Sequence, residues 1–365
     1  MPGSGTPTII FALFLFLVRG VSGQSSGSLQ PLWDRPMNSV RSVALSQTGQ
    51  CAVVATLERI SLLNRSGKEI WHWEYRRGNR FMIASRVAVS PGCDWIAATG
   101  GASYRYTWIA QRNGRLIPLR TRATPVSIAV SHHGNMLAIG TGGGDVLLFN
   151  SDGTMRWQRI LTHCCVQSLT FSEDDQAIVS MDGGVVSIDG RTISLNQLSV
   201  SGLRASKDLK AFVGWYEPNH GRGYCWILSV DSSGKELWRK NAPYDPASII
   251  SPAGDVVVAP VKDKQDNSEA AAQCDSDSPS PLRLLSRSGD VLETFSAMAR
   301  PLMFGPDGRW FLVRTDDFEA WDLRGRVLWS IPAFSQNLDW ITTTEDLRSI
   351  VEWSEDRIAL FAPPM

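Results

Sequence analysis

The chain has 365 residues, with 36 Lys and Arg against 36 Asp and Glu, so its formal net charge is zero. That balance argues against a nucleic-acid-binding protein or a polybasic membrane module, because both need a surface field of one sign. A composition that is 43% hydrophobic and 20% charged is typical of a globular chain rather than a disordered one.

The first feature along the chain is a predicted signal peptide. Residues 9–18 (IIFALFLFLV) form a run of 10 apolar residues, too short to span a bilayer, and residues 21–23 (VSG) supply a small-residue cleavage pattern. We therefore predict that residues 1–23 are a signal peptide, that residues 24–365 are the mature protein, and that it is secreted or periplasmic. No Cys follows the cleavage site until Cys51, so a lipid anchor is not expected, nor any other stable membrane anchor. An uncleaved anchor and a misassigned start codon are the alternatives.

The rest of the chain repeats one pattern: an apolar alternating run, a small residue, a turn and a second apolar run. The mean spacing of the small residue, about 43 residues, is in the range of four-stranded propeller blades. In chain order this residue is Ser46, Ser90, Ser131, Ser172, Ser206, Ser251, Gly305 and Thr344. The predicted fold is all-β: a single eight-bladed β-propeller of four-stranded antiparallel blades. The predicted blades start near residues 38, 83, 125, 166, 200, 246, 299 and 337.

Each unit except the last continues into a second turn and a closing strand. The turns at 64–71 (NRSGKEIW) and 231–238 (DSSGKELW) show the pattern best: Asn or Asp early in the turn and Gly three residues later. The side chain caps the turn and Gly allows a positive φ, which is hairpin chemistry. A Trp recurs four residues after the Gly, and we expect it to pack between blades; these are Trp71, Trp157, Trp238 and Trp329.

The eighth unit ends before its fourth strand. Residues 356–361 (DRIALF) align with the third strand of the first unit, and only four residues follow. The Leu32-Trp33 pair near the mature N-terminus matches Leu237-Trp238 in a complete unit. We therefore predict that a strand at residues 29–34 completes blade 8, which joins the two ends of the chain and leaves no open sheet edge.

At this point the sequence resembles known repeat families. The turn motif at 64–71 and 231–238 resembles the repeat of PQQ-like (quinoprotein-like) propellers, and the S-x-x-G turn is similar to WD40-like and YVTN-like repeats of secreted microbial propellers. The only Trp-Asp dipeptide in a suitable strand is Trp321-Asp322, so the WD40 signature is otherwise missing. The resemblance implies the fold and leaves the activity open.

The predicted function is that of a non-catalytic scaffold that binds a protein or a glycan. In a propeller blade the first and third turns lie on one face, and they are short here. The second turn, whose length varies, and the connection to the next blade lie on the other face, where we predict the binding site. Variable loops on a rigid scaffold usually carry binding. The alternative is that they are merely long, solvated hairpins. The candidate binding residues are Tyr104, Arg105, Tyr106, Trp215, Tyr216, His220, Arg222 and Tyr224. We expect a monomer that binds no nucleic acid.

Neither a metal site nor a cofactor is predicted. The loop at 262–281 carries four Asp residues at positions whose spacing matches no calcium loop: Asp263, Asp266, Asp275 and Asp277. Two adjacent histidines at residues 132–133 lie in a predicted turn, where we expect solvation rather than metal binding. No catalytic residue is predicted, because known catalytic motifs are absent or lie outside their structural context.

Six Cys in a secreted chain favour disulfides, although sequence alone allows 15 connectivities. We predict three pairs from their positions in the repeat: Cys51 with Cys93, Cys164 with Cys165, and Cys225 with Cys274.

The adjacent Cys164 and Cys165 also support an enzyme alternative. Quinoprotein alcohol dehydrogenases, which the turn motif resembles, carry a vicinal disulfide against their PQQ cofactor, so the resemblance implies a possible PQQ-dependent oxidoreductase. No residues here match the calcium ligands or the catalytic base of those enzymes. A propeller hydrolase or lyase with an acidic cluster in its channel is a further alternative.

Overall fold

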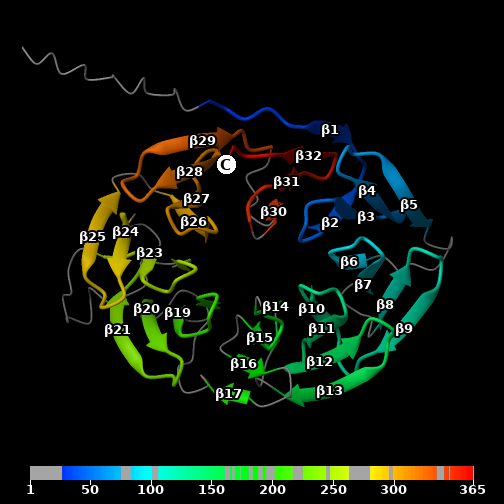
Figure 1. The fold of residues 1–365 in the computed structure, drawn as a ribbon, viewed down its shortest axis with the longest axis horizontal. Coiled ribbons are helices and arrows are strands. Elements are labelled where there is room, and N and C mark those ends of the chain that lie inside the picture. Colours follow the sequence, from blue (N-terminus) through cyan, green and yellow to red (C-terminus); the bar gives the residue numbers. More distant parts are fainter. Residues whose placement is uncertain are drawn as a thin grey trace, which may run out of the picture.

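A computed structural model describes most of the chain. The described residues are 27–74, 84–100, 106–160, 165–166, 169–172, 174–180, 184–187, 192–194, 202–216, 225–243, 247–262, 280–295, 299–334, 341–344 and 346–364. Within these ranges every regular element is a β-strand, and the strands form eight four-stranded antiparallel sheets. The sheets stand around a common centre in a propeller-like arrangement (Figure 1). The predicted all-β fold of four-stranded antiparallel sheets is confirmed.

Each sheet has its first strand nearest the centre and its fourth strand outermost (Figure 1). The inner strands are β2(Val40–Leu45), β6(Ala84–Val89), β10(Pro125–Val130), β14(Leu169–Phe171), β18(Gly202–Ala205), β22(Ile249–Ile250), β26(Arg300–Phe304) and β30(Ile341–Thr343). The second strands are β3(Cys51–Thr56), β7(Trp95–Gly100), β11(Met136–Thr141), β15(Ala177–Ser180), β19(Ala211–Tyr216), β23(Val256–Pro260), β27(Trp310–Arg314) and β31(Ile350–Trp353).

The third strands are β4(Arg59–Asn64), β8(Tyr106–Gln111), β12(Asp145–Asn150), β16(Gly184–Ser187), β20(Trp226–Asp231), β24(Leu282–Ser286), β28(Phe318–Asp322) and β32(Arg357–Phe361). The outer strands are β5(Glu69–Glu74), β9(Leu116–Arg120), β13(Met155–Ile160), β17(Thr192–Ser194), β21(Glu236–Asn241), β25(Val291–Phe295), β29(Val327–Ile331) and β1(Trp33–Pro36). Each inner strand begins within four residues after the corresponding predicted blade start.

The outer strand β1 comes from the opposite end of the chain to the rest of its sheet. It pairs antiparallel with β32, from Trp33 opposite Leu360 to Pro36 opposite Arg357. The residues before it lie along the neighbouring sheet, where the N–H of Leu29 donates to the carbonyl oxygen of Ser330 at 2.8 Å. The strand therefore begins later than the predicted 29–34, because its first residues lie beside β29 rather than β32.

The repeated small residue closes the turn between the first two strands of each sheet. The Ser46 hydroxyl accepts a hydrogen bond from the N–H of Cys51 at 3.1 Å, and five other units repeat this contact through Ser90, Ser131, Ser206, Ser251 and Thr344. A buried backbone N–H needs such a partner, which explains why a hydroxyl recurs here. In the fourth unit the Ser172 hydroxyl donates to the Asp174 carboxylate. Gly305 has no hydroxyl, and a Cβ there would lie 2.4 Å from the Trp310 ring.

The fourth position of this turn has a positive φ in all eight units, from 53° to 72°. Half of the units place a Gly there, which adopts that conformation at no steric cost. The other four units place a side chain there instead, at Cys93, Asp175, Leu209 and Leu347. Cys93 and Asp175 both reach across to the preceding sheet, so this position is a contact between neighbouring sheets.

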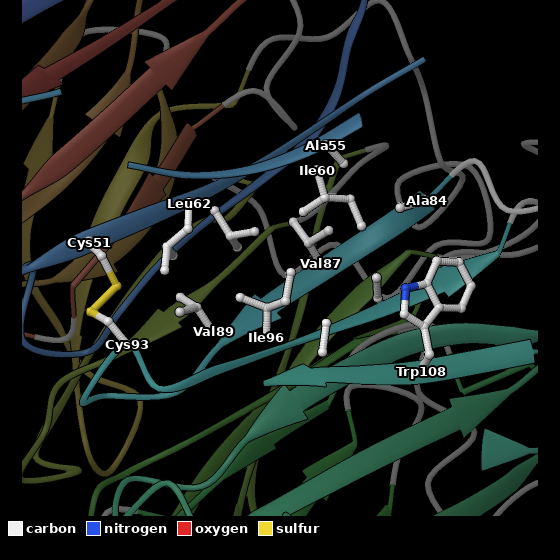
Figure 2. Packing of buried hydrophobic residues seen from close by; sticks show 13 residues of the cluster. Cys51, Ala55, Ile60, Leu62, Ala84, Val87, Val89, Cys93, Ile96 and Trp108 are labelled. Carbon is white, nitrogen blue, oxygen red and sulfur yellow. A yellow bond between two sulfur atoms is a disulfide. The ribbon is translucent and has the colours of Figure 1, made fainter. Parts of the chain in front are cut away.

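The hydrophobic core is divided into clusters between neighbouring sheets. Figure 2 shows one of them, in which Ile60 and Leu62 of β4 face Val87 and Ile96 of the next sheet. The Cys51–Cys93 disulfide closes one end of this cluster (Figure 2). Such clusters hold the sheets together in sequence around the ring, because each sheet buries both of its faces against its neighbours.

The recurrent Trp residues pack between sheets, as predicted. Trp238 is 8% exposed, and its indole Nε1 donates to the carbonyl oxygen of Arg287 in the next sheet at 3.1 Å. Its ring covers Gly289, where a Cβ would lie 2.7 Å from the indole. Trp329 is 4% exposed in another cluster between sheets, and Trp71 and Trp157 pack against two further ones.

Candidate functional site

A cavity of about 420 Å³ lies where four neighbouring inner strands, β14, β18, β22 and β26, reach the turns that follow them. Its lining is Thr170, Phe171, Ser172, Leu203, Arg204, Ala205, Ser206, Lys207, Leu209, Ile249, Ile250, Pro252, Leu302, Met303, Phe304 and Pro306. Most of these side chains are apolar, two are basic and none is acidic. Ligand pockets in proteins have this size and this mixture of apolar walls with a few polar groups.

Arg204 is the basic residue of the inner wall. It stands in β18, and its guanidinium carbon lies 5.7 Å from the centre of the Trp215 ring, a cation–π contact. One guanidinium nitrogen approaches the Leu203 carbonyl oxygen at 3.4 Å. Burial lowers the pKa of Arg204, and the nearby charge of Arg300 lowers it further. The guanidinium is thus held among apolar groups and close to a second positive charge.

A second, smaller cavity of about 170 Å³ lies beside the first, at the ends of β2, β6, β10, β14 and β30. Thr170 and Phe171 line both cavities, so β14 separates them. His132 contributes to the wall of the smaller cavity.

Asp175 organises the two adjacent histidines. Its carboxylate accepts from the backbone N–H of His132 and His133 at 2.7 and 2.9 Å, and it contacts the Nδ1 atom of each ring at 2.9 and 2.6 Å. Burial alone would raise the pKa of Asp175, but the hydrogen bonds from the His133 and His132 backbones outweigh it and the pKa is lowered. The expectation of a merely solvated turn is therefore wrong for His132, whose side chain is 11% exposed.

Glu352 is a buried acid in the sheet that follows the β26–β29 sheet along the chain. It stands in β31, is 1% exposed, and accepts a short hydrogen bond from the Phe334 N–H on one oxygen. Its other oxygen, Oε2, is buried and has no hydrogen-bond partner among the described residues. Burial raises the pKa of Glu352 to about 7, against the opposing effects of the Phe334 hydrogen bond and the Arg314 charge. It lines neither of the two cavities.

Most of the predicted loop-binding residues lie outside the described part of the chain: Tyr104, Arg105, His220, Arg222 and Tyr224. Tyr106 is the first residue of β8 and is 49% exposed. Tyr216 is the last residue of β19.

Trp215 does not lie in an exposed loop, so its prediction as a surface binding residue is wrong. It is in β19, is 9% exposed and packs in a cluster between two sheets. The physical reason is that a second strand has neighbouring sheets on both of its faces, which buries every described side chain of β19. The structure instead brings Trp215 to the guanidinium of Arg204.

Two of the predicted disulfides can be compared with described residues. Cys51 and Cys93 are bonded, with their Cα atoms 6.3 Å apart. The predicted Cys164–Cys165 bond is wrong, because Cys165 is a thiol whose Sγ lies 3.7 Å from the Gly142 carbonyl oxygen. Consecutive Cα atoms are about 3.8 Å apart across a trans peptide, closer than the roughly 4.4–6.8 Å usual for disulfides, which disfavours a vicinal bond.

The third predicted pair is described at one end only. Cys225 is buried and disulfide-bonded, while Cys274 lies outside the described residues. The four Asp residues of the loop at 262–281 lie outside them as well. Within the described ranges, no group of three or more His, Cys, Asp or Glu side chains could hold a metal ion. Nor does any helix there have the length and hydropathy needed to cross a membrane.

Sequence reasoning missed Arg204, Asp175 and Glu352. A signal for Arg204 was present in the aligned repeats. Several of the inner strands contain an Arg, and none of the described inner strands contains an acidic residue. The signal for Asp175 was an acidic side chain at a turn position that is Gly in half of the units. No comparable signal exists for Glu352, because its burial depends on contacts with the preceding sheet.

Comparison with known proteins gives the fold and nothing further. No protein-family model matches this chain, and no curated protein matches it in sequence. Among solved structures, the crystal structure of the computationally designed Ika8 protein is similar, with a TM-score of 0.63 and 14% sequence identity. The match covers 93% of this chain and 100% of that one. At this identity the likeness concerns the fold alone.

Proposed function

We propose that the protein is an extracytoplasmic, eight-bladed β-propeller that works as a non-catalytic binding scaffold. The eight four-stranded sheets and the pairing of β1 with β32 support a ring whose last blade is completed by the N-terminal strand. The Cys51–Cys93 disulfide supports an oxidising compartment outside the cytoplasm.

The observation that carries the proposal is the 420 Å³ cavity among the inner strands. Its walls come from four neighbouring sheets, so a rigid ring presents them in a fixed geometry. The lining contains hydroxyl groups, but none of its described residues has a carboxylate or an imidazole to act as a general base. Two of these hydroxyls, those of Ser172 and Ser206, are held by hydrogen bonds within their own turns. The cavity is therefore suited to binding rather than to catalysis.

The experiment that tests this proposal blocks the cavity with one side chain. Wild-type protein should bind the neutral fluorophore N-phenyl-1-naphthylamine saturably. Ala205→Phe, which places a ring in the cavity wall, should abolish that binding. Ala253→Phe is the matched control, because Ala253 is an exposed turn residue outside the lining. Equal binding by the two variants would contradict the proposal.

We further propose that the variable loops form a second surface, for a protein or glycan partner. Tyr106 supports it, because this aromatic residue is 49% exposed at the base of one such loop. Replacing Tyr104, Arg105 and Tyr106 together by Ala should abolish capture of a partner in a pull-down. Ala205→Phe should leave the pull-down unchanged. Ala205 lies beside the turn between the first and second strands of its sheet, whereas Tyr106 follows the turn between the second and third strands.

A further inference from the structure

We infer that the 420 Å³ cavity binds a small organic anion with an apolar body, such as a medium-chain or aromatic carboxylate. This inference rests on the proposed function, because it assigns a ligand class to the same cavity. It follows from the charge of the inner strands, the surroundings of Arg204 and the apolar lining.

The described inner strands carry charge of one sign only. They contain four arginines and no Asp, Glu or Lys; the arginines are Arg41, Arg86, Arg204 and Arg300. The whole chain has equal numbers of basic and acidic residues, so the positive charge is concentrated toward the centre of the ring. Charges of one sign that line a concave, low-dielectric wall focus the electrostatic potential and raise the local concentration of an oppositely charged ligand.

Arg204 is the arginine that lines the cavity, and none of the described carboxylates neutralises it. Its contacts are the Trp215 ring, the Leu203 carbonyl oxygen and the like charge of Arg300. Removing a guanidinium from water without a counter-charge is unfavourable for folding. A bound carboxylate would supply that counter-charge, and the guanidinium fork matches a carboxylate with two parallel hydrogen bonds.

The second basic residue of the lining is Lys207, which follows Arg204 by three residues in the turn after β18. It is exposed, so it adds attraction for an entering anion, whereas Arg204 sits in the inner wall. Among the described residues of the lining, these two side chains are basic and none is acidic.

The remaining walls specify the other half of the ligand. Phe171, Leu203, Ile250, Met303 and Phe304 supply an apolar lining from four sheets. An inorganic anion would leave these walls in contact with water, whereas an apolar chain or ring would bury them. A ligand with one anionic group and one apolar body satisfies both halves of the cavity.

Isothermal titration calorimetry with three probes of equal chain length tests the inference: octanoate, octan-1-ol and octylammonium. We expect octanoate to bind wild-type protein at least about tenfold more tightly than octanol, which corresponds to one good charge-assisted contact. Octylammonium should bind most weakly. Raising the salt concentration should weaken octanoate binding and leave octanol binding unchanged.

Arg204→Gln should reduce octanoate affinity at least about tenfold and change octanol affinity less than about twofold. The matched control is Arg309→Gln, which removes the same charge from an exposed turn residue outside the lining and should change neither affinity. Arg204→Gln should also melt at or above the wild-type temperature, because it removes an uncompensated charge. A purely structural Arg204 would give a lower melting temperature instead.

The outcomes separate the two proposals. Equal binding of octanol and octanoate, with no effect of Arg204→Gln, would overturn the anion inference and leave the cavity a general apolar site. Absence of binding by all three probes would overturn the cavity as a ligand site altogether. Should Arg204→Gln fail to fold, the salt dependence of wild-type binding decides, since an anion site must weaken with salt while an apolar site does not.

Discussion

The indole of Trp33 covers Gly67, and a Cβ on that glycine would lie 2.8 Å from the ring. The same indole donates its Nε1 hydrogen to the carbonyl oxygen of Arg65 at 2.9 Å. Trp238 makes the equivalent pair of contacts with Arg287 and Gly289 in the next sheet. The N-terminal strand β1 therefore contacts the sheet that follows it in the same way as an ordinary outer strand does.

This equivalence predicts the cost of disrupting the join between the two chain ends. Trp33→Ala should lower the free energy of unfolding by about 2–3 kcal/mol, since it removes both a hydrogen bond and inter-sheet packing. Trp238→Ala is the matched variant and should cost a similar amount. Deleting residues 24–36 should lower the melting temperature sharply, because it also exposes the edge of β32. Urea denaturation gives both free energies, and an unchanged melting temperature for the deletion would refute a stabilising role of β1.

The repeat made the sheets predictable from sequence because its residues act locally. Ser46 and its equivalents cap the N–H of a residue five positions later, and Asn64 caps the N–H of Ser66 and Lys68 within one turn. Such contacts impose a fixed spacing on the sequence. The Leu-Trp pair at 32–33 was informative for the same reason, because its partner turn is repeated in other units.

The candidate site was less predictable because it depends on which strands come together in space. Arg204 lies in an ordinary strand segment, and only its position beside Arg300 and Trp215 gives it significance. The loop interpretation of Trp215 failed because the sequence alone placed the end of its strand too early. The variable loops were chosen as the candidate site because they are rich in aromatic residues and Arg. The cavity is instead lined largely by residues of ordinary strand composition.

Asp175 provides a test of the contacts between neighbouring inner turns. Asp175→Asn should lower the free energy of unfolding by about 1–3 kcal/mol near neutral pH, because a buried, charged acceptor of several hydrogen bonds is replaced by a neutral one. Since the pKa of Asp175 is lowered in the folded protein, its stabilisation is present above the pKa of the unfolded chain and is lost as pH falls through the folded value.

The measurement is the difference in stability between the wild type and Asp175→Asn as a function of pH. That difference should shrink as the solution is acidified from neutral pH. Asp307→Asn, in an exposed turn of another sheet, is the control and should show a small and constant difference. A wild-type advantage that grows on acidification would contradict this account of Asp175.

The Cys51–Cys93 disulfide should contribute to stability through the loop it closes. The two residues are separated by 42 positions, and a loop of this length gives about 4 kcal/mol in the chain-entropy model. The Cys51→Ser and Cys93→Ser double variant should therefore unfold at clearly lower urea concentration than the oxidised wild type. Reduction of the wild type should reproduce the loss and leave the double variant unaffected. A double variant as stable as the oxidised protein would show that the bond adds nothing to the packing around it.

Glu352 should give the protein a pH dependence of the opposite sign to that of Asp175. Its pKa is raised by burial to about 7 in the folded protein, against an ordinary value of 4.5. The folded state therefore binds a proton more readily than the unfolded state, and the carboxyl destabilises the fold as pH rises from 4.5 through 7. The full effect is about 3 kcal/mol at the usual conversion of pKa into free energy.

Glu352→Gln should remove this dependence while retaining a side chain of the same size. We expect the variant to be close to the wild type in stability near pH 4.5 and more stable than it at pH 8, because an amide cannot ionise in the buried site. Glu355→Gln, which changes an exposed residue in the adjoining turn, keeps the wild-type pH profile if the effect belongs to Glu352. Urea denaturation at several pH values distinguishes the two variants. A Glu352→Gln protein that is less stable than the wild type at pH 8 would contradict this account. It would show that Arg314 and the Phe334 N–H stabilise the ionised carboxylate by more than burial destabilises it.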